Sequence, residues 1–147
     1  MSGFKFSLQR ILELRASAEK LQAAIMQRAA AAEGARRLAS QASAADLDRV
    51  QDQTSEIAAA PAGLWDAYAL SAEAARSRQE QDVGALRDAE ASRMAQQERF
   101  TDARQARRAL ELLREKRVAE WSIAAARAEQ ADTDEVARQV TETGDDE

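Results

Sequence analysis

A single proline divides a chain that otherwise favours helix. Pro61 is the only proline among 147 residues, and Gly63 follows it in the stretch Ala-Pro-Ala-Gly at 60–63. Proline lacks an amide hydrogen and clashes with the preceding turn, so a helix must end or kink there. Glycine adds the backbone freedom that a chain reversal uses. The sequence therefore predicts two long helices, folded back on each other with a turn at about residues 60–63.

The composition on both sides of this turn is typical of a coiled coil. Alanine, the strongest helix former, makes up about a quarter of the chain, while charged residues are 32% and aromatic residues 4%. Because large apolar residues are too few to fill a layered core, we expect an all-α antiparallel coiled-coil hairpin. It would form one elongated domain over residues 1–147. We place the first helix at about 3–59, the second at about 64–138, and a frayed acidic tail at about 139–147.

The residue types that the chain lacks exclude several kinds of chemistry. It has neither Cys nor His, which removes thiolate nucleophiles, disulfides, zinc-type sites and the usual neutral-pH base. The carboxylates Glu111 and Glu115 fit a solvated helix face better than a catalytic pair. A two-helix hairpin offers no water-excluding pocket, so we expect no enzyme, no cofactor and no metal site. No segment has the apolar run of a membrane span, and the charged N-terminus is unlike a signal peptide.

Charge is distributed unevenly along the chain, although the net charge is only −5. Residues 1–60 carry 8 basic and 7 acidic groups, residues 61–131 carry 12 of each, and residues 132–147 carry 1 and 7. A balanced hairpin with an acidic tail is a poor nucleic-acid binder. It also lacks the strongly basic face of a membrane-surface helix, so we expect neither nucleic-acid binding nor direct membrane insertion.

Large apolar residues predict the seam between the two helices. In the first helix, spacings of three and four residues run from Ile11 through Ala18 to Ile25, which is the heptad pattern of a coiled coil. The second helix continues the pattern with fewer, more widely spaced members. The predicted seam consists of Ile11, Leu14, Leu21, Ile25, Leu38, Leu86, Phe100, Leu110 and Leu113.

An antiparallel hairpin makes a further demand on which residues meet. The numbers of two facing residues should add to about 124, twice the position of the turn. By that rule Leu38 meets Leu86, and Phe4 falls near Trp121. Residues beyond about 124 then have no partner in the first helix. We therefore expect the second helix to overhang at the end that bears the termini.

Two helix glycines fall within two turns of facing each other. Gly34 and Gly84 allow two interpretations. In the first, each is a tolerated helix glycine that lowers helix stability by about 1 kcal/mol relative to alanine. In the second, the two together mark a close approach of the helices or a flexible joint.

Basic and aromatic residues gather at the end that bears the termini. Phe4, Phe6 and Trp121 lie there, whereas Trp65 and Tyr68 lie at the bend. End aromatics either cap the seam or contribute to an interface. The basic run beside them either flanks the seam or forms a patch for an acidic protein partner. Its members are Arg104, Arg107, Arg108, Arg114, Lys116 and Arg117.

Three stretches resemble a known family. Residues 4–15, FKFSLQRILELR, resemble the F-x-F-x-L-Q-x-L-L-x-L-R start of the flagellar export protein FliJ family. Residues 110–117, LELLREKR, resemble its C-terminal LE-L-E+R segment, and residues 129–135, EQADTDE, its E-Q-x-x-x-D-E close. Length, layout and the lack of Cys agree with that family, while the alanine-rich middle departs from it and carries no family motif.

The resemblance implies a soluble, non-enzymatic component of the flagellar type III export apparatus, similar to the central stalk of rotary ATPases. It implies that the end bearing the termini engages the pore of the hexameric export ATPase and promotes its assembly and activity. It also implies contacts with the export gate membrane protein and export chaperones, a cytoplasmic location at the membrane export apparatus, and a role in motility and chemotaxis. Mapped onto this chain, the residues that contact the ATPase ring would be Leu8, Arg10, Leu12, Arg15, Arg114, Arg117 and Trp121.

Two other interpretations stay open at this stage. An injectisome stalk protein has the same architecture and differs only in its end motifs. A generic coiled-coil scaffold or adaptor would need its seam but could lose Arg114 and Arg117 without effect.

Overall fold

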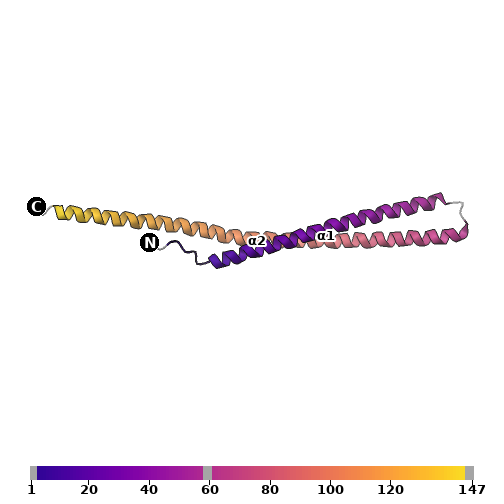
Figure 1. Cartoon of the computed structure of the whole chain (residues 1–147), viewed down its shortest axis with the longest axis horizontal. Helices are drawn as coiled ribbons and strands as arrows, with labels where there is room; N and C mark the ends of the chain where they lie inside the picture. The colour runs from indigo at the N-terminus through magenta and orange to yellow at the C-terminus, as the bar shows by residue number, and fades with distance from the viewer. Residues whose placement is uncertain (1–2, 58–60, 145–147) are drawn as a thin grey trace. The chain divides into compact units, whose positions relative to one another are not determined.

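Two helices make up the computed structural model, which describes residues 3–57 and 61–144, the side chains of 139–144 excepted. Helix α1 spans Gln9–Glu56 and helix α2 spans Ala62–Gly144. Figure 1 shows both helices. The fold is the predicted all-α antiparallel hairpin, and its turn falls between Glu56 and Ala62, where the sequence places it.

The helix ends follow from local hydrogen bonding. Residues 3–6 have no regular secondary structure and residues 7–8 form a turn, in which the amide of Gln9 donates to the carbonyl of Phe6 over 3.1 Å. Helix α1 therefore begins later than the predicted start near residue 3. The amide of Leu64 donates to the carbonyl of Pro61 over 3.0 Å. Proline suits this position because its missing amide hydrogen has no role at a helix start.

Gly63 lies in the first turn of α2 and not in the bend, contrary to the role predicted for it. No glycine of the described residues has positive φ. The helix backbone continues to Gly144, past the predicted end at about 138. The acidic tail is predicted to fray. This prediction falls on the side chains of 139–144 and on residues 145–147, all of which lie outside the described part of the chain.

The chain divides into two units, and each is described by itself. The terminal unit comprises Met1–Ala18 and Ala103–Glu147, and the bend unit comprises Glu19–Asp102. The prediction of one elongated domain stays a prediction.

Polar pairs connect α1 and α2 within the bend unit. The Gln22 amide donates to Gln96 over 2.7 Å, and the Arg93 guanidinium donates to the Glu33 carboxylate. Arg37 and Arg78 of the bend unit lie 3.5 Å and 3.9 Å from carboxylates across the seam. The pairs join Gln22 with Gln96, Glu33 with Arg93, Arg37 with Glu90, and Asp46 with Arg78. Their residue numbers add to 118, 126, 127 and 124, which confirms the antiparallel pairing near 124.

The seam on α1 follows a different heptad phase from the predicted one. Every seventh residue from Leu12 is buried or half-buried, through Glu19, Met26, Glu33, Ser40, Leu47 and Thr54. By contrast, four residues of the predicted seam are 45% to 69% exposed, so their assignment was wrong. These four are Ile11, Leu14, Leu21 and Leu38.

The physical reason for the phase is the polar partner on α2. Arg93 lies half-buried on the seam face of α2, where it can pair with a carboxylate that α1 turns inward. Glu33 supplies that carboxylate and is 9% exposed. Because coiled-coil faces repeat every seven residues, turning Glu33 inward also turns Leu12 inward and Leu14 outward.

On α2 the seam is regular. Residues at alternating spacings of three and four are buried or half-buried from Tyr68 to Leu110. The predicted seam residues Leu86, Phe100, Leu110 and Leu113 are half-buried, as is Ile25 on α1. Among the described residues only two apolar side chains are buried, Leu12 and Ala75, so apolar burial contributes little to holding the helices together.

The two helix glycines are not points of close approach. A Cβ added at Gly34 or at Gly84 would have no atom within 4 Å. Of the two interpretations of these glycines, the structure therefore favours tolerated helix glycines.

Candidate functional site

The terminal unit brings the N-terminal segment against α2. The ring of Phe4 lies 6.1 Å from the ring of Trp121, centroid to centroid, with the planes tilted by 58°. This confirms the predicted proximity of these two residues. Tilted aromatic pairs at this separation are favourable. Trp121 nevertheless stays 45% exposed, so the pair does not seal the end of the seam.

Two adjoining depressions lie around this aromatic pair, and we call them together the terminal groove. One is lined by Phe4, Lys5, Phe6, Ser7, Leu8, Leu113, Arg117, Glu120 and Trp121. The other is lined by Phe4, Lys5, Phe6, Gln9 and Arg114. Aromatic walls beside cationic side chains suit an acidic protein segment with an apolar anchor.

The arginines near the groove differ in whether they are already paired. Arg117 donates to Glu120 over 3.0 Å. Arg10, Arg15 and Arg114 are exposed and form no ion pair with the described residues. An exposed guanidinium without a carboxylate keeps its planar fork of donors available for another molecule.

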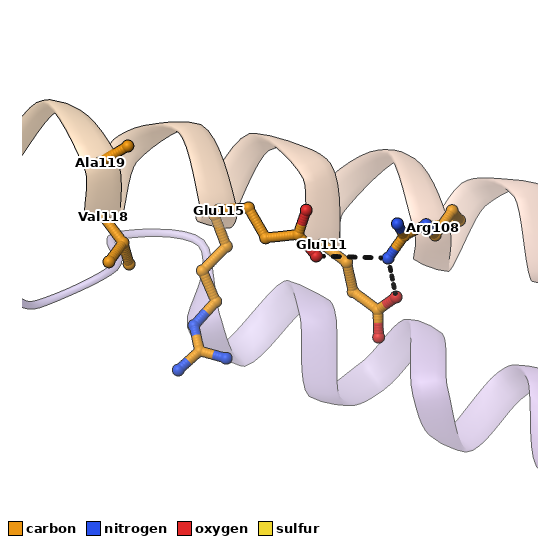
Figure 2. Close-up of a pocket in the computed structure, with 6 residues that line it drawn as sticks. Arg108, Glu111, Glu115, Val118 and Ala119 are labelled. Atoms are coloured by element: carbon orange, nitrogen blue, oxygen red, sulfur yellow. Dashed lines mark hydrogen bonds and ion pairs between the residues drawn. The ribbon is translucent and has the colours of Figure 1, made fainter.

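A charge network runs along α2 beside the groove (Figure 2). Arg108 lies 3.3 Å from carboxylate oxygens of both Glu111 and Glu115, and Arg107 also donates to Glu111. The hydrogen bond from Arg107 lowers the pKa of Glu111 below its ordinary value of 4.5, and Arg108 adds to the effect. Much of the basic run is thus paired along its own helix.

A third depression lies over this network. It is lined by Arg108, Glu111, Arg114, Glu115, Val118 and Ala119, and Figure 2 shows five of these residues on the α2 ribbon. Its carboxylates accept hydrogen bonds from arginine and are exposed or half-buried, which is the solvated helix face expected for Glu111 and Glu115.

The seven residues predicted to contact the ATPase ring differ in how exposed they are. Leu12 is 8% exposed, so it faces the seam and cannot contact another protein; that assignment was wrong. Leu8 is half-buried and lines the terminal groove. The five others are exposed. They are Arg10, Arg15, Arg114, Arg117 and Trp121.

Sequence reasoning missed two exposed apolar residues of the terminal unit. Ile11 and Leu14 belonged to the predicted seam, yet they are 45% and 63% exposed beside Arg10 and Arg15. Local spacing could not have found them, because residues 8–14 are apolar on both faces of the helix.

The C-terminal part of α2 extends the terminal unit. All side chains of residues 126–138 are exposed, in line with the expected overhang. No helix of the described residues is long and apolar enough to span a bilayer. These residues also contain no group of three or more Asp or Glu side chains placed to hold a metal ion.

Comparison with known proteins gives one match. The family model described as Flagellar FliJ protein matches residues 4–143, nearly the whole chain. No curated protein and no solved structure matches the chain.

Proposed function

Because the chain belongs to the flagellar FliJ protein family, which makes it a component of the flagellar export apparatus, we propose that it is a stalk-like assembly factor for the export ATPase. It would insert its terminal unit into the hexameric ring and promote ring assembly and ATP hydrolysis. The chain itself would hydrolyse nothing.

The observation that carries this proposal is the chemistry of the terminal unit's exposed side chains. Exposed cations without carboxylate partners, Arg10, Arg15 and Arg114, lie in the same unit as the half-exposed pair of Phe4 and Trp121. Arginine and tryptophan are the side chains that dominate binding energy at interfaces. We replace Leu12 in the contact set by the exposed Ile11 and Leu14.

The remaining partners belong to the same proposal. We propose that the chain also contacts the export gate membrane protein and export chaperones, and that it works in the cytoplasm at the membrane-bound apparatus. The family match supports the flagellar system over an injectisome, and a specific role over a generic coiled-coil scaffold.

The test is ATP hydrolysis by the cognate export ATPase across a titration of the chain. Wild type is compared with a double variant, Arg10→Ala with Arg114→Ala. The matched control is Arg87→Ala with Arg99→Ala, two exposed arginines of the bend unit without an ion pair among the described residues. We expect stimulation by wild type and control, and its loss in the first double variant.

Circular dichroism must show that both double variants keep wild-type helicity. Equal stimulation by the two double variants would contradict the proposed contact. Absence of stimulation and of co-sedimentation with the ring for wild type would leave the scaffold interpretation.

A further inference from the structure

The outer face of α1 in the bend unit repeats a coiled-coil pattern without a helix against it. Leu21 and Leu38 are 64% and 69% exposed. Between and beyond them, the positions at the same heptad spacing are also exposed. We define the outer face of α1 as Leu21, Ala24, Arg28, Ala31, Ala35, Leu38, Ala42 and Ala45. Two exposed leucines in phase with each other form a seam that only a partner helix would cover.

The corresponding face of α2 has a different character. Its exposed positions at heptad spacing include Ser77, Gln81, Gly84 and Asp88. Acidic and basic residues follow one another along that helix without segregation. That face of α2 also carries the exposed Leu70, but it includes the acidic Asp88, whereas the outer face of α1 has two leucines and no acidic residue.

The charged side chains of α1 in the bend unit that form no ion pair with the described residues are sorted by sign along the helix. Those in the first half of the bend unit that have no ion pair with the described residues are Lys20, Arg28 and Arg36, all basic. Those in the second half are Asp48, Asp52 and Glu56, all acidic. The other charged side chains of α1 in this unit already have interactions: Glu19, Glu33 with Arg37, and Asp46 with Arg49.

This sorting identifies the partner that fits the outer face. We propose that the outer face of α1 binds the same face of a second copy, antiparallel, around a two-fold axis near Leu38. Under that symmetry, Arg28 of one copy lies opposite Asp48 and Asp52 of the other, and Lys20 lies opposite Glu56. A parallel pair would instead place Arg28 against Arg28, which is repulsive.

The small side chains of the outer face let the two helices approach closely, so the ion pairs at its two ends come within reach. Such an interface buries little area, so the association is weak and depends on its charges. It uses no residue of the terminal groove. Its test is therefore separate from that of the ATPase contact.

The chain has no cysteine, so single thiols report the geometry directly. Three variants are compared with a short bismaleimide cross-linker: Leu38→Cys, Leu21→Cys, and Leu70→Cys on α2 as the control. Near the axis, Leu38→Cys faces its own mate, whereas two copies of Leu21→Cys lie about 50 Å apart at 1.5 Å per residue. We expect a cross-linked dimer from Leu38→Cys alone. Equal dimer from Leu21→Cys, or none from Leu38→Cys above the control, would overturn the proposal.

Charge reversal in the Leu38→Cys background sharpens the result. Arg28→Glu should reduce dimer yield on the order of five-fold, because each lost pair occurs twice in a symmetric interface. Adding Asp48→Arg with Asp52→Arg should restore it. If the yield of cross-linked dimer stayed the same after both sets of changes, the antiparallel pairing would be overturned.

Discussion

The terminal unit and the bend unit use arginine in different ways. In the bend unit, Arg93 and Arg78 reach across the seam to Glu33 and Asp46, so their charges hold α1 against α2. In the terminal unit, Arg108 and Arg117 pair along their own helix, and Arg10, Arg15 and Arg114 form no ion pair with the described residues. Arginines of the bend unit thus reach across to the other helix, whereas Arg10, Arg15 and Arg114 of the terminal unit keep their guanidinium groups available for binding.

This difference shows why a chain with so little apolar burial keeps a defined pairing. Ion pairs and amide pairs are individually weak, but each is satisfied only at one register. Sliding α1 by one heptad would separate the buried Glu33 carboxylate from Arg93 and leave it with Arg37 of its own helix as its ion-pair partner. The cross-helix pairs of the bend unit therefore specify the register more than they add stability.

The largest expected effect tests which face of α1 is inside. Leu12→Ala should lower the free energy of unfolding by about 2–3 kcal/mol, because Leu12 is one of the few buried apolar side chains. Leu14→Ala, the matched control at an exposed position, should change it by less than about 0.5 kcal/mol. Urea unfolding followed by circular dichroism measures both. Equal effects would refute the heptad phase described here.

The next effect tests the polar layer of the bend unit. Glu33→Ala should lower the free energy of unfolding by about 2 kcal/mol, because it leaves Arg93 without its seam partner. The double variant Glu33→Leu with Arg93→Leu should recover most of that loss, since it removes both polar groups together. The midpoint of urea unfolding measures the three proteins. A double variant less stable than Glu33→Ala would contradict a paired role.

A smaller and opposite effect tests the helix glycines. Gly34→Ala and Gly84→Ala should each stabilise the chain by about 1 kcal/mol, because alanine is the better helix former and the added methyl group meets nothing within 4 Å. Thermal unfolding measures the gain. A loss of stability at either position would restore the interpretation of a close approach.

The smallest effect concerns the charge network of the terminal unit. The pKa of Glu111 is lower in the folded chain than its ordinary value of 4.5, so its charged form stabilises the fold above that pH. This contribution is lost as the pH falls below 4.5 and through the folded pKa. Glu111→Gln should remove that part of the pH dependence of thermal unfolding. An unchanged acid profile would show that the Arg107 hydrogen bond contributes nothing in solution.

The sequence was sufficient for the fold and insufficient for the seam. Pro61 and the helix-forming composition predicted the two helices and their turn, and the pairing rule placed Phe4 beside Trp121. The choice of Ile11 and Leu14 for the seam failed because α1 carries heptad patterns on two faces, and the outer one has the larger side chains. Glu33 and Arg93 decide between them, and a contact across 60 residues leaves no mark in the local spacing of α1.

The candidate site was predictable in the same uneven way. The family-like ends marked the exposed Arg114, Arg117 and Trp121, because they combine charge with aromatic character. The assignment of Leu12 to the contact surface was wrong for the same reason as the seam. The predicted heptad phase placed Leu12 on the outside of α1, whereas it is buried.

The most direct test compares Arg93→Ala with Arg114→Ala in co-sedimentation with the export ATPase, with unfolding measured alongside. Arg114→Ala should weaken binding about ten-fold and leave stability unchanged, as expected for an interface arginine. Arg93→Ala should lose about 1–2 kcal/mol of stability and bind as wild type while it is folded. Wild-type binding by Arg114→Ala, together with weakened binding by folded Arg93→Ala, would contradict the division of roles between the two units.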